Sequence, residues 1–316
     1  MPAPSKPEIS VIIPYFNNSK TIGRALRSVS EQLFKNYEII VVNDGSDDWD
    51  EAQRIVNDFN FEKLTIVHHN KNSNGAVARN TGIERAVGNF IAFLDSDDEW
   101  LADHLLKSID FCKEYSYRST RLFLCSSIII HHNSDLSTRG IKRNLDVTKV
   151  EKVISVLEEI YVKNRILSCP TFFFSRDVVE NVKFDTSLRR FQDIDFCLNA
   201  SQIPGLEFYL LPHVGARVHW NDLSINKLKS KGLKSDSIQY FLNKNITLFD
   251  DRTKSKFIHK ELIPVLASEF KITGVIRLLI AYHSNINFKG IITILSYLSL
   301  RRSDYVWKTI QKIRNR

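Results

Sequence analysis

The chain has 316 residues, of which 43% are hydrophobic and 25% charged, a composition typical of globular proteins and unlike that of disordered or fibrous chains. Its length suits one large domain, or one domain with a smaller appendage. The formal net charge of +8 indicates an anionic partner, and nucleic acid, an acidic membrane surface or a phosphorylated substrate would each satisfy it.

The leader and the cysteines favour a cytoplasmic protein. Residues Met1 to Pro7 lack the apolar core of a signal peptide, and no apolar run is long enough to span a bilayer. The four cysteines are widely spaced, without the paired spacing of zinc-ribbon or redox motifs, so we expect buried free thiols.

Four short apolar segments in the first hundred residues predict strands: Glu8 to Pro14, Glu38 to Val42, Leu64 to His68 and Phe90 to Leu94. Their centres recur every 26 to 28 residues, the length of repeated strand-helix-strand units. The first helix between them should start from the N-cap residues Asn17-Asn18-Ser19 and bury one face, made of Ile22, Ala25, Leu26, Val29 and Leu33. The pattern predicts an α/β fold with a doubly wound, mostly parallel sheet flanked by helices.

The fourth apolar segment stops in a cluster of acids, Asp95-Ser96-Asp97-Asp98-Glu99. Mg²⁺ and Mn²⁺ prefer oxygen ligands and bridge carboxylates to phosphates. Asp95 and Asp97 are therefore candidate metal ligands, and Asp98 and Glu99 would add spare charge. A solvated acidic turn that caps the next helix is the alternative for so short a motif.

The loops after the second and third predicted strands are also polar, and they should meet the acids at one edge of the sheet. Asp44 stands in a turn where it either accepts hydrogen bonds from a base or ribose, or caps the next helix. Gly75 permits close backbone approach at a helix N-terminus, and Arg79, one turn later, can reach a phosphate or a base.

Five blocks of sequence carry a family resemblance: Ser10 to Pro14 with Asn17, Leu26 to Gln32, Glu38 to Ser46, Asn74 to Gly82, and Phe93 to Asp98. In this order they resemble the inverting glycosyltransferases of family 2, which have the GT-A fold. The resemblance implies that Asp44 holds a nucleobase, Asp95 the ribose or metal shell, and Asp97 the Mn²⁺ or Mg²⁺ that bridges a diphosphate. The full donor set it implies is Pro14, Asp44, Gly75, Arg79, Asp95, Ser96 and Asp97.

The resemblance also implies the catalytic base. The family has an acidic pair at the start of a later helix, and this chain has Gln192-Asp193 there, so Asp193 would take the proton from the acceptor hydroxyl. Asp195 is the rival, and both acids could instead favour the positive end of a helix. His219 ends a late predicted strand and matches a family histidine that contacts metal or pyrophosphate; a structural histidine is the alternative.

Three further segments have less specific patterns. The polar stretch Asn133 to Thr148 is either a loop over the acceptor site or merely a variable excursion. Leu223 to Lys234 is lysine-rich and is either a basic flap over the diphosphate or a solvated linker. From Ser235 the pattern is helical, and the basic, partly apolar end Arg301 to Arg316 favours a helix lying on anionic lipid over a packed appendage.

We therefore expect residues 1–115 to form a nucleotide-sugar donor half, 116–222 an acceptor-binding and catalytic-base half of the same domain, and 223–316 the basic flap and a helical C-terminal extension. The expected reaction is metal-dependent, inverting transfer of a hexosyl or N-acetylhexosaminyl group from a UDP-sugar to a glycan or lipid-linked glycan. The expected setting is capsule, lipopolysaccharide or exopolysaccharide biosynthesis at the inner face of a bacterial membrane.

Two other functions compete with this one. A metal-dependent nucleotidyltransferase would also use carboxylates on such a sheet, but it would want a glycine-rich loop after the first strand, and Pro14 to Ser19 contains no glycine. A basic nucleic-acid-binding protein would explain the net charge. We expect no nucleic acid, because the cleft loops are acidic and the cations gather in the tail.

Overall fold

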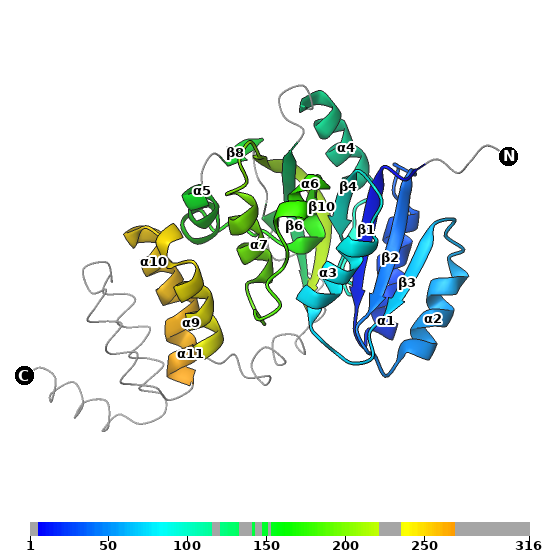
Figure 1. Ribbon diagram of the computed structural model, residues 1–316, viewed down its shortest axis with the longest axis horizontal. Coiled ribbons are helices and arrows are strands. Elements are labelled where there is room, and N and C mark those ends of the chain that lie inside the picture. Colours follow the sequence, from blue (N-terminus) through cyan, green and yellow to red (C-terminus); the bar gives the residue numbers. More distant parts are fainter. Residues whose placement is uncertain are drawn as a thin grey trace, which may run out of the picture. The chain divides into compact units, whose positions relative to one another are not determined.

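The computed structural model in Figure 1 describes residues 6–115, 121–132, 141–142, 147–150, 153–220 and 235–268. The chain divides into two compact units, residues 1–160 with 164–226 and residues 161–163 with 227–316. The expected basic flap and the expected lipid-binding end lie outside the described residues, as does most of the expected loop from 133 to 148. The division into donor and acceptor halves stays a prediction.

The first unit begins with the four predicted strands, which alternate with helices. In chain order these elements are β1 (Ile9–Tyr15), α1 (Ser19–Ser30), β2 (Tyr37–Asn43), α2 (Trp49–Asp58), β3 (Leu64–His68), α3 (Gly75–Arg85) and β4 (Phe90–Phe93). β1 pairs in parallel with both β2 and β4, and β2 pairs in parallel with β3. The loops that follow these strands therefore leave the sheet at one edge.

Helices cover both faces of this parallel part, as the alternation along β1 requires. Ile9, Val11 and Ile13 belong to the buried cluster that includes the apolar face of α1. Ile12 points the other way, toward α3, and a Cβ placed on Gly82 would come within 2.3 Å of its side chain. Glycine at that position lets α3 pack closely on the sheet, and the doubly wound arrangement is confirmed (Figure 1).

The sheet continues with strands whose directions are mixed. Its order is β3-β2-β1-β4-β9-β6-β10-β5, with β7 paired to β6 and β8 to β10. β9 runs antiparallel to both of its neighbours, β4 and β6, whereas β10 is parallel to β6. The remaining elements of this unit are β5 (Glu99–Trp100), α4 (His104–Tyr115), β6 (Leu122–His132), β7 (Ile141–Lys142), β8 (Thr148–Val150), α5 (Val153–Leu157), β9 (Phe172–Ser175), α6 (Asp177–Asn181), α7 (Gln192–Ala200) and β10 (Glu207–Trp220), with a π-helix at Glu158–Val162 that continues into the second unit and a 3-10 turn at Cys169–Thr171.

One local expectation is wrong, and another holds only in part. Leu33 does not lie on the buried face of α1, because the helix ends at Ser30 and the Leu33 side chain is 60% exposed. The helix does begin at the expected place, with Asn18 as the N-cap residue, but the Asn18 side chain makes no capping hydrogen bond. Instead the Asp48 carboxylate, from the loop after β2, accepts a hydrogen bond from the Ser19 amide at 2.8 Å. The expectation of buried free thiols is confirmed for all four cysteines.

The second unit is helical, as expected from Ser235 onward. Its described elements are α9 (Ser235–Lys244), a 3-10 turn (Ile246–Leu248), α10 (Asp251–Phe257), a π-helix (Ile258–Leu262) and α11 (Ile263–Ser268). Phe241, Phe249 and Phe257 pack against one another in its core, with 5.5 Å between the ring centroids of the first and the last. In the part of the chain that the structure describes, every helix is too short or too polar to cross a bilayer.

Candidate active site

A pocket of about 220 Å³ lies at the carboxyl edge of the parallel strands. It brings together most of the expected donor residues: Pro14 lies near the end of β1, and the others follow β2, β3 and β4. Its lining is Pro14, Tyr15, Phe16, Asn18, Asp44, Asn72, Gly75, Ala78, Asp95, Ser96 and Asp97. Arg79 belongs to the expected set but is not part of the lining; it lies 8% exposed and contacts Asp95.

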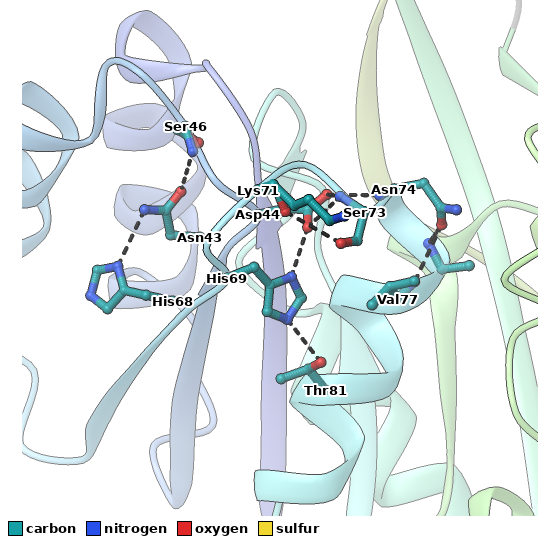
Figure 2. Close-up of polar contacts among 11 residues, drawn as sticks. Asn43, Asp44, Ser46, His68, His69, Lys71, Ser73, Asn74, Val77 and Thr81 are labelled. Carbon is teal, nitrogen blue, oxygen red and sulfur yellow. Dashed lines mark hydrogen bonds and ion pairs between the residues drawn. The ribbon is translucent and has the colours of Figure 1, made fainter.

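One end of the pocket is built around Asp44, which is only 2% exposed. Figure 2 shows its carboxylate at the centre of the loop after β3. The Ser73 amide lies 3.0 Å from both carboxylate oxygens, and the Asn74 amide lies 2.9 Å from Oδ2. His69 Nδ1 lies 2.7 Å from Oδ1. Asp44 therefore ties the loop after β2 to the loop after β3.

Each of these two loops contains a residue with a positive φ angle, a backbone conformation that the hydrogen bonds to Asp44 hold in place. Asn74 has φ 97° and ψ 162°, a region that L-residues rarely enter and that costs of order 1–3 kcal/mol. Its side chain accepts hydrogen bonds from the Ala76 and Val77 amides and so caps α3. Gly45 also has a positive φ of 69°, and a Cβ there would meet the Lys71 backbone at 2.4 Å. The sequence could not show this interlock, because it depends on two loops meeting.

Arg79 connects the acidic cluster to the helix that carries the expected base. Its Nη2 lies 2.5 Å from Asp95 Oδ1, and its Nη1 donates to Gln192 Oε1 at 3.2 Å. The guanidinium also lies over the Phe184 ring, 5.5 Å from the centroid. A buried guanidinium needs charged or polar partners on several sides, and here they come from two distant segments.

The acidic cluster is partly buried: Asp98 is enclosed, whereas Asp95 and Asp97 line the pocket. Burial, and next the charge of Asp95, raise the pKa of Asp97 to about 6. Asp98 is 4% exposed, and its pKa is raised by burial and by the charge of Asp97. The Arg24 side chain hydrogen bonds to the Asp97 carbonyl. Crowded carboxylates of this kind favour a cation.

His219 and Glu99 have partners that the sequence did not indicate. His219 Nε2 lies 3.0 Å from Glu99 Oε1, and the same oxygen accepts from Arg217 Nη1 at 2.7 Å. The His219 amide donates to Asp98 Oδ1 at 2.9 Å. Glu99 is thus an ion-pair partner and not spare charge. Within the described ranges, no three His, Cys, Asp or Glu side chains are already arranged as a metal site.

Asp193 and Asp195 both lie in the first turn of α7 but have different surroundings. Asp193 is partly exposed, and its Oδ2 accepts a hydrogen bond from the Cys169 amide at 3.3 Å. Burial raises the Asp193 pKa, whereas the nearby Arg79 charge lowers it. Asp195 is fully buried and accepts from Asn199 Nδ2 at 3.0 Å. Of the two acids, Asp193 is the one with exposed surface.

Comparison with known proteins shows which proteins this chain is similar to. Residues 10–133 match the model of the family described as glycosyl transferase family 2. The amylovoran biosynthesis glycosyltransferase AmsB of Erwinia amylovora is 29% identical over 237 residues, covering 74% of this chain and 75% of that protein. TuaG of Bacillus subtilis, whose name places it in teichuronic acid biosynthesis, is 31% identical over 195 residues, covering 60% of this chain and 70% of TuaG.

A solved structure has a similar fold. The crystal structure of residues 1–349 of Staphylococcus aureus TarS in complex with UDP-GlcNAc aligns with a TM-score of 0.62, covering 90% of this chain and 82% of that one. The two sequences are 18% identical, so the likeness concerns the fold. It confirms the expected GT-A architecture.

Proposed function

The chain belongs to glycosyltransferase family 2, and from that premise we propose that its pocket binds a UDP-sugar whose sugar is transferred, with inversion, to a hydroxyl of a surface glycan. Family membership favours a glycosyltransferase over the nucleotidyltransferase and the nucleic-acid-binding alternatives. The observation that carries the proposal is that Asp44, Gly75, Asp95 and Asp97, from the ends of three different strand-to-helix or strand-to-strand connections, line one pocket. TarS, a structural neighbour, was crystallised with UDP-GlcNAc, and AmsB and TuaG are named for polysaccharide synthesis.

In this proposal the donor lies across the pocket from Asp44 to Asp97. The Asp44 carboxylate accepts hydrogen bonds and suits a base that carries an N–H. The amide end of α3 begins at Gly75 and favours negative charge. The diphosphate would then extend toward Asp95 and Asp97, and Arg79 would supply positive charge behind it.

The carboxylates at the far end fit a divalent cation. Mn²⁺ or Mg²⁺ bound there would stabilise the charge that develops on the leaving diphosphate. Asp97 and Asp95 are the residues that would hold it, because their oxygens suit a hard cation, and a cation there would offset the burial and the Asp95 charge that raise the Asp97 pKa. His219 as a third ligand stays a prediction, since its Nε2 is engaged by Glu99.

Asp193 is the proposed base. Its carboxylate takes the proton from the acceptor hydroxyl while that oxygen attacks the anomeric carbon and the bond from that carbon to the diphosphate breaks. One carboxylate suffices because inversion in a single displacement forms no glycosyl-enzyme. Arg79 contacts both Asp95 and Gln192 and so fixes the spacing between the donor end and the base.

For the acceptor and the transferred sugar we propose only the chemical class. A glycan or lipid-linked glycan hydroxyl would approach from the side of α7, and a hexosyl or N-acetylhexosaminyl group would be transferred. The proposed setting is the cytoplasmic side of the membrane, with peripheral contact through the C-terminal segment. That segment lies outside the described residues.

The test compares Asp193→Asn with Asp195→Asn, using UDP-glucose and UDP-GlcNAc with a membrane extract as the acceptor source. We expect Asp193→Asn to bind UDP as the wild type does and to lose transfer by about 10²- to 10⁴-fold. Asp195→Asn, the isosteric control two residues away, should retain transfer in its folded fraction. Transfer by Asp193→Asn at the wild-type rate would contradict the assignment.

A further inference from the structure

His69, the residue directly after β3, connects three elements around the nucleotide pocket. Its amide donates to the Asn43 carbonyl at 2.8 Å, which continues the β2–β3 pairing by one residue. One ring nitrogen, Nδ1, lies 2.7 Å from Asp44 Oδ1, and the other, Nε2, lies 2.9 Å from Thr81 Oγ1 on α3 (Figure 2). Both edges of the imidazole are thus used.

The surroundings decide which ring nitrogen carries the proton. An ionised Asp44 carboxylate can only accept hydrogen bonds, and its other described partners, the Ser73 and Asn74 amides, are donors. Nδ1 must therefore carry a proton and donate it to Oδ1. Thr81 Oγ1 can then donate to Nε2, which fixes the plane of the ring.

This arrangement controls how Asp44 faces the pocket. The Asn74 amide donates to Oδ2, and the Ser73 amide lies between the two oxygens. His69 Nδ1 contacts Oδ1. Without His69 the carboxylate keeps only donors from the loop of residues 73 and 74, which is itself strained at Asn74. The direction of its remaining lone pairs then depends on that loop alone.

We propose that His69, oriented by Thr81, is a positioning residue that aims the Asp44 carboxylate at the base of the donor and so gives the pocket its preference for uracil over cytosine. The inference rests on the proposed donor site. Uracil presents an N–H at ring position 3, which a fixed carboxylate can accept, whereas cytosine presents a lone pair there. A site built to accept a hydrogen bond rejects an analogue that lacks the donor, because its own polar group is then left unpaired.

The chain supplies a matched set of variants. An asparagine side chain at position 69 places an amide N–H near the position of Nδ1, whereas glutamine reaches the position of Nε2. His69→Asn should therefore keep the bond to Asp44, and His69→Gln should keep only the contact with Thr81. His68, the preceding residue, is an exposed histidine whose Nδ1 lies 3.2 Å from the Asn43 side chain and not from Asp44, so His68→Ala is the control.

The experiment is titration of UDP and of CDP, with Mn²⁺ present, into the full chain and these variants, with a melting temperature for each. We expect His69→Gln and His69→Ala to lose about 10- to 100-fold in UDP affinity and to show a smaller ratio of UDP to CDP affinity. His69→Asn and His68→Ala should keep that ratio. Thr81→Val should lower the ratio of UDP to CDP affinity slightly, whereas Thr81→Ser, which keeps the hydroxyl, should leave the ratio unchanged.

The outcomes separate the inference from the proposed function. If the wild type binds UDP and the His69 variants weaken UDP and CDP equally, the donor site stands and the positioning role is wrong, because His69 then only supports the fold. If His69→Gln retains the preference and His69→Asn loses it, the contact with Asp44 is not the one that matters. If the wild type binds neither nucleotide, the donor site fails and the positioning role fails with it.

Discussion

The two ends of the pocket hold aspartates in opposite electrostatic states. At one end Asp44 is surrounded by N–H donors from Ser73, Asn74 and His69, which offset its charge while it still lines the pocket. At the other end Asp97 and Asp98 share a buried cluster with Asp95, and their pKa values are raised. Arg79 offsets Asp95 but not the whole cluster.

The difference indicates two kinds of preorganisation. The Asp44 end can recognise a neutral group by shape and hydrogen bonding, and it needs no further charge. The Asp97 end is destabilised by burial of its carboxylates and by their mutual repulsion, and the proposed cation would gain part of its binding energy by relieving that repulsion.

Asp44→Asn should give the largest loss of stability. An amide in place of the carboxylate keeps one acceptor but turns an N–H₂ group toward backbone N–H donors, which leaves a buried donor unpaired. We expect the free energy of unfolding to fall by about 2–4 kcal/mol, measured by urea denaturation at pH 7 without metal. Unchanged stability would mean that the Asp44 contacts are not formed in solution.

Asp97→Asn should act in the opposite direction. The Asp97 pKa is raised from 3.8 to about 6, so the folded state binds more protons than the unfolded state between these pH values. That contribution stabilises the protein below pH 3.8 and is lost as the pH rises through 6. Without metal at pH 7 the variant should be about 1–3 kcal/mol more stable than the wild type. A less stable variant would contradict the claim that the Asp97 carboxylate destabilises the folded protein.

His213 gives a pH dependence of the opposite sign away from the pocket. Burial and the charge of Lys107 lower its pKa from 6.5 to about 4, with Asp103 opposing, and the ring of His104 lies 5.8 Å away. The unfolded state therefore binds more protons between pH 4 and 6.5, and stability falls as the pH drops through that range. His213→Gln should flatten the profile by at most about 1.4 kcal/mol per pH unit; an unaltered slope would show that His213 does not titrate in this way.

Gln192→Glu should have the smallest effect. Glutamate would place a second carboxylate beside Asp193 while still contacting Arg79, and a nearby like charge raises the pKa of a base. The acid side of the kcat/KM profile should move up by less than about one pH unit. A shift in the other direction would mean that Arg79 dominates the change, or that Asp193 is not the base.

The repeated part of the fold was predictable because its signal is local. Each of the first four strands is a short apolar run with an amphipathic helix after it, and the carboxyl edge follows from parallel pairing. The site residues Asp44, Gly75, Asp95 and Asp97 follow the ends of these units, so the sequence could also predict that they would meet.

The rest depends on contacts between distant segments. β9 pairs antiparallel with β4, although the two strands are far apart in the sequence. No pattern in the residues near Phe90 indicates this partner. Glu99 and Trp100 form a short strand against β10, a pairing with a segment far along the chain. His69 and Asp48 looked like ordinary polar residues in loops, and their roles become visible only when the partners Asp44 and Ser19 are placed beside them.

The most direct test of the central claim is isothermal titration of UDP, GDP and CDP, each with and without Mn²⁺, into the wild type and Asp97→Asn. The account predicts that UDP binds the wild type with Mn²⁺, and that the dependence on Mn²⁺ is lost or much reduced in Asp97→Asn. Absence of nucleotide binding under every condition, or binding that Mn²⁺ and Asp97 do not affect, would contradict it.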